Sequence, residues 1–435
     1  MTHYGAIRCR QKNMIEIKPL HHCDAVVRLL GSKSYTHRAL VISALADGES
    51  LLINALRSED TEHTAQALKK FGVPIFWEGD RVRVLGKGGK LKAGEERIFV
   101  GNSGTSMRFL TALSALKNGR TLLDGNERMR ERPIGDLLNG LSALGVRAYS
   151  KEKNGCPPVM MESQGLKGGK TKIKGEESSQ FLSALLMIAP YAQEDIQVEI
   201  TGHLASKPYV DITRDVMSTF GVEVKRDGYH FFFVRAGQHY LPKTYRVEGD
   251  ASNASYFFSA AALSKGRVRV ENFFPKSVQG DAGFLTILEN MGCEVVRGDR
   301  WAEVRGKELQ GIEIDMNPMP DLVPTLAVTA AFARGKTVMK NIGHLRFKES
   351  DRIQALAGEL IKMGIRVEEG DDWLKIEGGK PHGAEIETYN DHRLAMSFAI
   401  AGLAVPGVKI KGEQCVDKSF PEYWEKFRTL GEIGR

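Results

Sequence analysis

An apolar residue, a glycine and an alternating apolar segment recur together six times along this chain, and this period constrains the fold most. The repeated glycines are Gly72, Gly145, Gly221, Gly292, Gly364 and a weaker sixth, Gly431, so the intervals are 73, 76, 71, 72 and 67 residues. Most of these glycines follow a helical pattern and precede a strand pattern, as a left-handed helix terminus does. A regular period of this length predicts repeated structural units.

A second feature repeats in phase with the glycines: an Ala-rich apolar run of helical length with polar residues around its start. The six runs begin at Thr36, Thr105, Ser178, Ser252, Leu322 and His392. Six units of about 72 residues, each with two helices and several short strands, account for the whole chain. Helices this apolar on all sides should lie inside a layer of other elements. We therefore predict an α/β (α+β) fold with two similar domains of three units each.

Composition limits the class of protein. With 435 residues, 42% hydrophobic and 26% charged, the chain predicts a globular protein. Its net charge of +7 suits small anions, and its basic clusters lack the interleaved aromatic residues of a nucleic-acid groove, so no nucleic-acid partner is expected. No apolar run approaches a membrane span, and residues 1–13 contain no signal-peptide core. Met14 is a second candidate start.

Cysteine and histidine usage points to a reducing compartment without a metal. The five cysteines are scattered and form no C-x-x-C pair, which favours the cytoplasm. The segment His21-His22-Cys23 has no second ligand pair at a useful spacing. We therefore predict no metal site.

The polar starts of the apolar helices point to anion binding. A helix N-terminus presents unpaired N–H groups and the positive end of a dipole. For any single helix the simpler interpretation is an N-cap. Several starts nevertheless hold side chains that no cap requires: Lys33, Arg38, Arg108, Gln180 and Arg393. We therefore predict that the helix starts face a shared cleft.

Two segments repeat one design a unit apart. Gly31–Arg38 (GSKSYTHR) and Gly101–Arg108 (GNSGTSMR) combine backbone N–H groups with cationic side chains, as phosphate or carboxylate binding requires. The charged segment 128–132 is by composition alone more typical of a solvated surface. Later segments mix acids and bases at loop-to-helix junctions: 320–321, 348–352, 390–393 and 417–421. They suit an acid–base enzyme acting on an anion, or surface ion pairs.

These segments closely resemble the family of 5-enolpyruvylshikimate-3-phosphate (EPSP) synthases. Matching segments include GSKSYTHRAL, GNSGTSMR, RMRERPIG, SKPYVDITRDVM, FKESDRI and TYNDHRLAM, in the family's order from about Ile15 to the C-terminus. The resemblance implies three βαβαββ units in each domain and an inside-out α/β barrel. It implies one domain of residues 1–29 plus 249–435, which carries both termini, and another of 30–248, with the active site between them.

The implied reaction transfers the enolpyruvyl group of phosphoenolpyruvate to the 5-hydroxyl of shikimate 3-phosphate and releases phosphate, without a metal or other cofactor. The implied catalytic residues are Lys33, Asp321 and Glu349. The implied shikimate 3-phosphate site consists of Lys33, Ser34, Arg38, Ser178, Ser179, Ser206, Tyr209, Asp321, His344 and Lys348. The implied phosphoenolpyruvate site consists of Lys33, Gly104, Arg132, Gln180, Arg352, Arg393 and Lys418. The chain departs from the family pattern at Leu30, Ser103, Phe109 and His344.

The two implied carboxylates suggest a division of proton transfer. We expect Glu349, with Lys33, to act at C3 of phosphoenolpyruvate, and Asp321 to deprotonate the 5-hydroxyl. In the alternative, Glu349 only orients Lys348 and Arg352 as an ion pair.

Two other functions stay open at this point. UDP-N-acetylglucosamine enolpyruvyl transferases share the architecture, but they have GAKN in place of GSKS and a mobile-loop cysteine that the segment NERMRERPIG lacks. A noncatalytic polyanion-binding protein would fit the basic charge but would leave Asp321 and Glu349 without a role. We expect a monomeric, cytoplasmic transferase of chorismate and aromatic amino-acid biosynthesis that closes its domains around its substrates.

Overall fold

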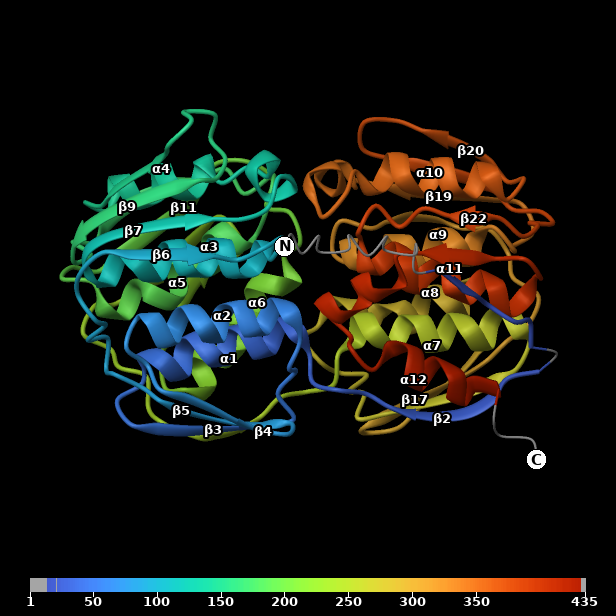
Figure 1. Cartoon of the computed structure of the whole chain (residues 1–435), viewed down its shortest axis with the longest axis horizontal. Coiled ribbons are helices and arrows are strands. Elements are labelled where there is room, and N and C mark those ends of the chain that lie inside the picture. Colours follow the sequence, from blue (N-terminus) through green and yellow to red (C-terminus); the bar gives the residue numbers. More distant parts are fainter. Residues whose placement is uncertain (1–13, 21, 432–435) are drawn as a thin grey trace, which may run out of the picture.

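The computed structural model describes residues 14–20 and 22–431 and folds them into two lobes that lie side by side (Figure 1). The predictions made for residues 1–13 and for His21 lie outside the described residues. Each lobe contains three of the repeated units. Short 3₁₀ helices, labelled η, connect some of the longer elements.

The first lobe begins after the chain has crossed from the second. Its first unit contains α1 (Lys33–Leu45), β3 (Glu49–Ile53), α2 (Glu59–Lys70), β4 (Ile75–Glu78) and β5 (Arg81–Leu85). The second contains β6 (Glu96–Phe99), α3 (Gly104–Leu113), β7 (Asn118–Asp124), α4 (Gly135–Ala143), β8 (Arg147–Ser150) and β9 (Val159–Gln164). The third contains β10 (Gly169–Ile173), α5 (Gln180–Ile188), β11 (Ile196–Ile200), α6 (Pro208–Thr219), β12 (Lys225–Asp227) and β13 (Phe231–Val234), and β14 (Thr244–Arg246) follows.

The second lobe takes β1 (Met14–Glu16) and β2 (Asp24–Arg28) from the start of the described chain. Its next elements are α7 (Ala251–Ser264), β15 (Arg267–Glu271), α8 (Phe284–Asn290), β16 (Glu294–Arg297) and β17 (Trp301–Arg305). The following unit contains β18 (Glu313–Asp315), α9 (Val323–Ala330), β19 (Lys336–Lys340), α10 (Arg352–Lys362), β20 (Arg366–Glu369) and β21 (Leu374–Glu377). The last contains β22 (Glu385–Ile386), α11 (His392–Ala404), β23 (Lys409–Lys411) and α12 (Tyr423–Arg428).

Each unit builds its own sheet. In the first lobe the strand orders are β14-β3-β5-β4, β6-β7-β9-β8 and β10-β11-β13-β12. In the second they are β2-β15-β17-β16, β18-β19-β21-β20 and the three-stranded β1-β23-β22. Each four-stranded sheet has one parallel pair followed by antiparallel pairs, for example β6 with β7 and then β7 with β9. Three units follow the order βαβαββ along the chain, as the resemblance implied.

The two remaining four-stranded sheets exchange their first strands between the lobes. Strand β2 precedes α1 in sequence but pairs with β15 of the second lobe, and β14 precedes α7 but pairs with β3 of the first. The two chain segments that cross between the lobes meet at an antiparallel bridge between Gly31 and Gly249. Buried hydrophobic residues form one cluster between Tyr35 and Val247 and another that combines Ile17–Leu29 with Ala251–Leu430.

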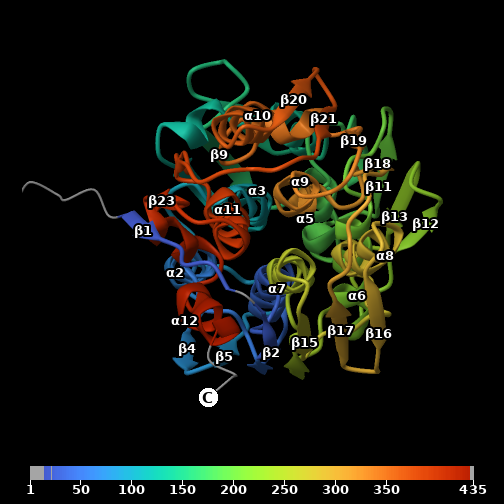
Figure 2. The same ribbon diagram turned by 90° about the vertical axis from the view of Figure 1, so that its right-hand side faces the viewer.

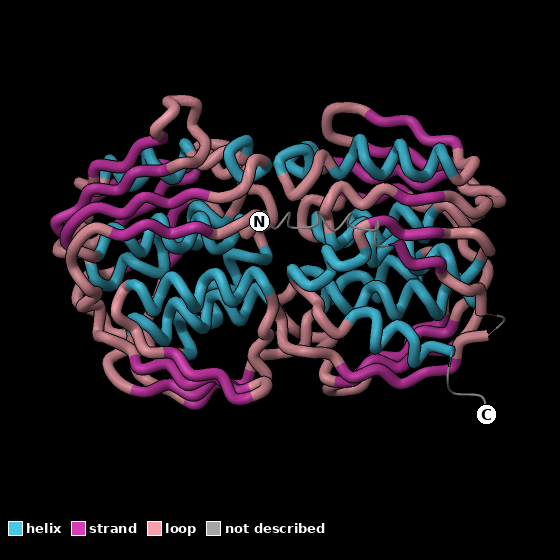
Figure 3. Tube along the Cα trace, in the orientation of Figure 1, coloured by secondary structure: helices cyan, strands magenta, loops and turns pink. Residues whose placement is uncertain are grey.

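The Ala-rich helices lie inside each lobe and the sheets outside, as the apolar runs predicted. Figure 3 shows the strands at the outer faces of both lobes, and Figure 2 shows α7, α9 and α11 near the centre of the second lobe. In α11 every residue from His392 to Leu403 is buried. The hydroxyls of Ser255, Thr325 and Ser397 connect these three helices at 3.1 and 3.3 Å, so the buried polar groups satisfy one another.

The first five repeated glycines follow the helices α2, α4, α6, α8 and α10 and end them in the predicted left-handed conformation. Their φ values lie between +80° and +108°. At the first of them, the amide of Gly72 donates to the Lys69 carbonyl and that of Val73 to the Leu68 carbonyl. These bonds satisfy the last carbonyls of α2 and turn the chain toward β4.

Candidate active site

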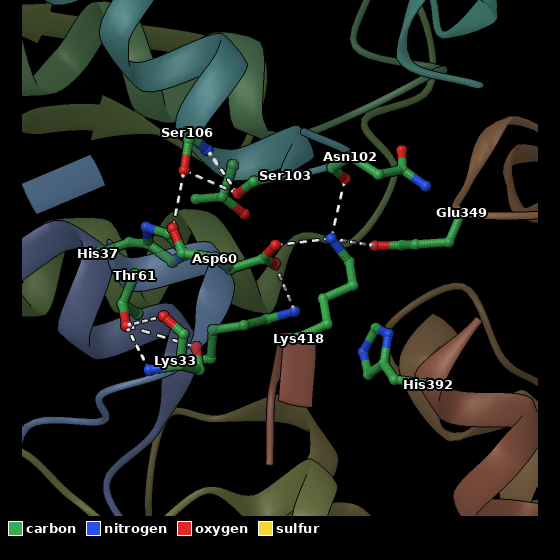
Figure 4. Close-up of polar contacts among 12 residues, drawn as sticks. Lys33, His37, Asp60, Thr61, Asn102, Ser103, Ser106, Glu349, His392 and Lys418 are labelled. Carbon is green, nitrogen blue, oxygen red and sulfur yellow. Dashed lines mark hydrogen bonds and ion pairs between the residues drawn. The ribbon is translucent and has the colours of Figure 1, made fainter. Parts of the chain in front are cut away.

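Lysines from both lobes meet at one buried carboxylate (Figure 4). Asp60, in the first turn of α2, accepts from the Lys418 ammonium at 2.6 Å and lies 3.3 Å from the Lys33 ammonium. Lys418 ends η7 (Glu413–Lys418) in the second lobe, whereas Lys33 begins α1 in the first. Lys418 also donates to the Asn102 carbonyl at 2.9 Å. This junction therefore joins two of the predicted phosphoenolpyruvate ligands across the lobes.

The charge of Asp60 is set by these lysines. Burial alone would raise the pKa of its carboxyl, but Lys418 and Lys33 outweigh burial and hold that pKa below its ordinary value. Asp60 is therefore an anion at neutral pH and neutralises part of the positive charge.

Arg352 is the centre of a second ion network. At the start of α10, its guanidinium lies 3.0 Å from Asp321, 3.0 Å from Glu349 and 2.8 Å from Asp391. Its side chain is 1% exposed. Arg393, in the first turn of α11, contacts Asp321 at 2.6 Å. Three segments that the sequence analysis singled out separately are therefore parts of one buried network, and these residues do not form surface ion pairs.

Both implied catalytic carboxylates are ionised. Burial opposes ionisation of Glu349, but Arg132, Arg352 and Lys418 hold its pKa well below the ordinary value. Arg132 and Lys418 each lie 4.0 Å from this carboxylate. For Asp321, Arg393 and Arg352 likewise outweigh burial and lower the pKa. Each carboxylate is thus present as a base.

The remaining phosphoenolpyruvate candidates surround the start of α3. Arg132 donates to the backbone carbonyl of Asn102 at 2.9 Å and to its side-chain oxygen at 3.1 Å. A Cβ at Gly104 would lie 2.2 Å from the Arg108 guanidinium and 2.5 Å from that of Arg132, so the missing side chain lets both arginines approach the start of α3 closely. Gln180, at the start of α5, donates to Thr105 at 3.0 Å. Ion pairs through Asp60, Glu349 and Asp321 thus link five of the seven predicted phosphoenolpyruvate residues: Lys33, Arg132, Arg352, Arg393 and Lys418. Gly104 and Gln180 lie at the adjoining starts of α3 and α5.

Part of the predicted shikimate 3-phosphate set adjoins this network. The Tyr209 hydroxyl lies 3.1 Å from Asp321, so α6 of the first lobe contacts the second. The Ser206 amide donates to Asn317 at 3.1 Å, and the Ser206 hydroxyl lies 3.5 Å from the His344 ring. Burial lowers the pKa of His344 to about 3, so this imidazole is neutral.

The other shikimate 3-phosphate candidates lie at helix starts. Ser178 and Ser179 precede α5 and are buried, and Ser34 is half-buried in the first turn of α1. Arg38, 1% exposed, bonds the Tyr209 carbonyl at 3.0 Å and Thr213 at 2.7 Å, so protein groups already hold its guanidinium.

Lys348 is the residue directly before Glu349 in the chain. Its burial lowers the pKa of the ammonium to about 8. The group therefore changes charge near physiological pH.

The charged segment 128–132 divides into three roles. Arg132 is buried in the site, and Arg130 lies on the surface with Asp124. Arg128 donates across the lobes to the carbonyls of Arg346 at 2.8 Å and Lys348 at 3.1 Å. The interpretation as a solvated surface is therefore wrong for Arg132 and Arg128, because both point into the lobe junction.

Sequence reasoning missed two carboxylates of this region, Asp60 and Asp281, and it singled out the segment 390–393 without giving Asp391 a role. Asp60 belongs to the acidic first turn of α2, which resembles any helix start. Asp391 is the N-cap of α11 and accepts from the Arg393 amide at 2.9 Å while also bonding Arg352. The charged segment 390–393 contained this residue, but its pairing with Arg352 depends on a contact with α10 that the segment itself does not show.

The described residues contain no group of three or more His, Cys, Asp or Glu placed to hold a metal ion. Among the helices of the described chain, none is long and apolar enough to cross a membrane.

Comparison with known proteins identifies the family. Residues 17–427 match the family model of EPSP synthase (3-phosphoshikimate 1-carboxyvinyltransferase). The chain is 49% identical over 422 residues to the 3-phosphoshikimate 1-carboxyvinyltransferase of Nostoc punctiforme. This alignment covers 96% of this chain and 99% of the relative. The chain is 45% identical over 423 residues to the 3-phosphoshikimate 1-carboxyvinyltransferase of a Sulfurovum species, with coverage of 96% and 99%.

The fold agrees with a solved structure of the same family. A 2.37 Å structure of EPSP synthase from Acinetobacter baumannii matches with a TM-score of 0.81 and 29% identity, covering 96% of this chain and 98% of that one. Sequence and fold thus agree. The chain belongs to the EPSP synthase family of 3-phosphoshikimate 1-carboxyvinyltransferases.

Proposed function

We propose that the chain transfers the enolpyruvyl group of phosphoenolpyruvate to the 5-hydroxyl of shikimate 3-phosphate at the buried ion network described above. Family membership supports the reaction and its place in chorismate and aromatic amino-acid biosynthesis. The observation that carries the placement is the convergence of buried or half-buried cations from both lobes on one junction: Lys33, Arg132, Lys348, Arg352, Arg393 and Lys418.

These cations suit two multiply charged substrates. Guanidinium groups bind carboxylate and phosphate through paired donors, and the ammonium groups add mobile positive charge. Bringing two anions together is opposed by their repulsion, which a preorganised cationic site offsets. We assign phosphoenolpyruvate to Lys33, Gly104, Arg132, Gln180, Arg352, Arg393 and Lys418. We assign shikimate 3-phosphate to Lys33, Ser34, Arg38, Ser178, Ser179, Ser206, Tyr209, Asp321, His344 and Lys348.

The addition step needs one proton delivered to C3 of phosphoenolpyruvate and one removed from the 5-hydroxyl. We assign the hydroxyl proton to Asp321, since Tyr209 and two arginines fix its ionised carboxylate. Glu349, with Lys33, serves C3, and it takes a proton from the new methyl group when phosphate leaves. The ion pair of Glu349 with Arg352 also supports the alternative in which this carboxylate only orients its neighbour.

The same proposal covers the domains and the working state. Residues 1–29 with 249–435 and residues 30–248 act as two domains that close over the site about the paired crossovers at Gly31 and Gly249. The separate hydrophobic clusters and the contacts between lobes support this assignment. The proposed enzyme is a cytoplasmic monomer: one chain supplies the whole site, and the four described cysteines, Cys23, Cys156, Cys293 and Cys415, are free thiols.

Phosphate release tests the function. The purified chain should release phosphate from phosphoenolpyruvate with shikimate 3-phosphate and should release none with UDP-N-acetylglucosamine. Release with the nucleotide sugar alone would select the other enolpyruvyl transferase. Salt-sensitive binding of polyanions without any turnover would contradict an enzymatic role.

A further inference from the structure

Asp281 is a buried carboxyl next to the proposed base, and none of the implied roles uses it. It lies in η4 (Gly280–Gly283) of the second lobe and is 5% exposed. The Ser252 hydroxyl donates to its Oδ2 atom. Within residues 14–20 and 22–431, its Oδ1 atom finds no hydrogen-bond partner. A carboxyl with one buried, unpaired oxygen is an unfavourable place for a full negative charge.

Tyr209 lies between this carboxyl and Asp321. Its hydroxyl oxygen is 3.1 Å from Asp321 Oδ2 and 3.4 Å from Asp281 Oδ2. A tyrosine hydroxyl has one proton to donate. If both carboxyls were ionised, they would compete for this single donor and repel one another.

The surrounding charges decide which carboxyl carries the negative charge. Asp321 is paired with Arg352 and Arg393, at 3.0 and 2.6 Å. Arg393 also faces Asp281, but its guanidinium contacts Asp321 and the Tyr256 hydroxyl.

The groups that face Asp281 come from four elements: Tyr209 of α6, Asp321 of η5 (Pro320–Leu322), Arg393 of α11, and Asp250 and Ser252 at the start of α7. Two of these neighbours are acidic and one is basic. Burial first, and then the charge of Asp321, raise the pKa of Asp281 to about 7.

We propose that Asp281 is a positioning residue that acts as a neutral carboxylic acid and thereby leaves the Tyr209 proton to Asp321. The hydroxyl of Tyr209 then donates to Asp321 Oδ2 and fixes the base that meets the 5-hydroxyl. The inference rests on the proposed role of Asp321. An ionised Asp281 would compete with Asp321 for the hydrogen bond that the Tyr209 hydroxyl donates, and it would place a second negative charge beside the base. Turnover should therefore fall as the pH rises.

A purely structural Asp281 predicts something different. In that case the Ser252 bond would only hold η4 against α7, and no proton on Asp281 would matter for turnover. Asparagine has nearly the shape of protonated aspartate and cannot ionise. The variant Asp281→Asn therefore separates protonation from shape.

Infrared spectroscopy tests the proton directly, without turnover. The difference spectrum of wild type minus Asp281→Asn, at about pH 6, should contain the carbonyl stretch of a protonated carboxyl, and by about pH 9 that band should be replaced by carboxylate bands. Carboxylate bands alone at about pH 6 would overturn the proposal. Wild-type protein with ¹³C-labelled aspartate gives the same readout if the variant does not fold, because labelling shifts the band.

The pH profile of kcat, at saturating concentrations of both substrates, tests the consequence. We expect wild-type kcat to fall about tenfold between about pH 7 and about pH 9, and that of Asp281→Asn to change less than about twofold. Asp299→Asn, at an exposed position of the same lobe, should keep the wild-type profile. An unchanged fall in Asp281→Asn would overturn the inference. The infrared spectrum reports only the proton on Asp281 and does not depend on whether Asp321 is the base. If Asp321 were not the base, the infrared bands would still appear as expected, and only the pH profile of kcat would differ.

Discussion

Lys418 of the second lobe donates to Asp60 of the first across 2.6 Å, and Lys33 lies 3.3 Å from the same carboxylate. One buried anion thus holds the two ammonium groups that the proposal assigns to phosphoenolpyruvate, one from each lobe. Asp60 therefore links the two lobes through the cations of the proposed phosphoenolpyruvate site.

Replacing Asp60 by asparagine should loosen the lobes when no substrate is bound. The change removes the anion that the buried Lys418 and the half-buried Lys33 share, and breaking a buried ion pair in this way costs about 3–5 kcal/mol. Small-angle scattering should show a larger radius of gyration for unliganded Asp60→Asn than for wild type. Saturating shikimate 3-phosphate and phosphoenolpyruvate should compact the variant, because the substrate anions replace the missing charge.

Asp47→Asn is the matched control, since Asp47 is exposed in the same lobe. It should scatter like wild type. Equal radii of gyration for unliganded Asp60→Asn and wild type would show that this ion pair does not hold the lobes together.

Lys33→Ala should lose nearly all turnover. Lys33 lies at the start of α1 and belongs to both proposed substrate sites, and no arginine supplies an equally movable proton. Steady-state phosphate release measures the effect, with Lys69→Ala, an exposed lysine of α2, as the control. Retention of more than about a tenth of wild-type kcat, a barrier change of about 1.4 kcal/mol, would remove Lys33 from the chemistry.

Binding of shikimate 3-phosphate should weaken above about pH 8. Burial lowers the pKa of Lys348 to about 8, so its ammonium is charged below that pH and neutral above it. Titration calorimetry on wild type should show Kd rising about tenfold between about pH 7 and about pH 9. Lys348→Arg keeps its charge throughout this range and should show a flat profile. The same rise in the arginine variant would assign the effect to another group.

The repeated units were predictable because their causes are local. A glycine that ends a helix in the left-handed conformation, and a helix apolar on all sides, are visible in any short window. The exchange of β2 and β14 does not follow from such local patterns, because each pairs with a strand more than 190 residues away, β2 with Arg267–Glu271 and β14 with Glu49–Ile53. Only the family resemblance implied it, by joining residues 1–29 to 249–435. Asp60 and Asp281 were missed for a similar reason: their roles depend on side chains contributed by other units.

The charged segment 128–132 shows that sequence reasoning can also fail over a few neighbouring residues. Arg128, Arg130 and Arg132 alternate in sequence, yet one bridges the lobes, one lies on the surface and one is buried. Composition alone predicts a solvated surface position for all three arginines. Their separation comes from η2 (Arg128–Glu131), whose turn points successive side chains in different directions.

Deuterium exchange at C3 should separate the roles of Glu349 and Asp321. Glu349 contacts Arg352 at 3.0 Å and lies 4.0 Å from Lys418, so Glu349→Gln removes a base without removing the neighbouring cations. This variant should bind shikimate 3-phosphate but should incorporate solvent deuterium at C3 very slowly during turnover. Asp321→Asn should instead be limited at attack by the 5-hydroxyl. Mass spectrometry of recovered phosphoenolpyruvate and product measures the label. Near-normal incorporation by Glu349→Gln would leave Lys33 as the C3 proton carrier and reduce Glu349 to orienting Arg352.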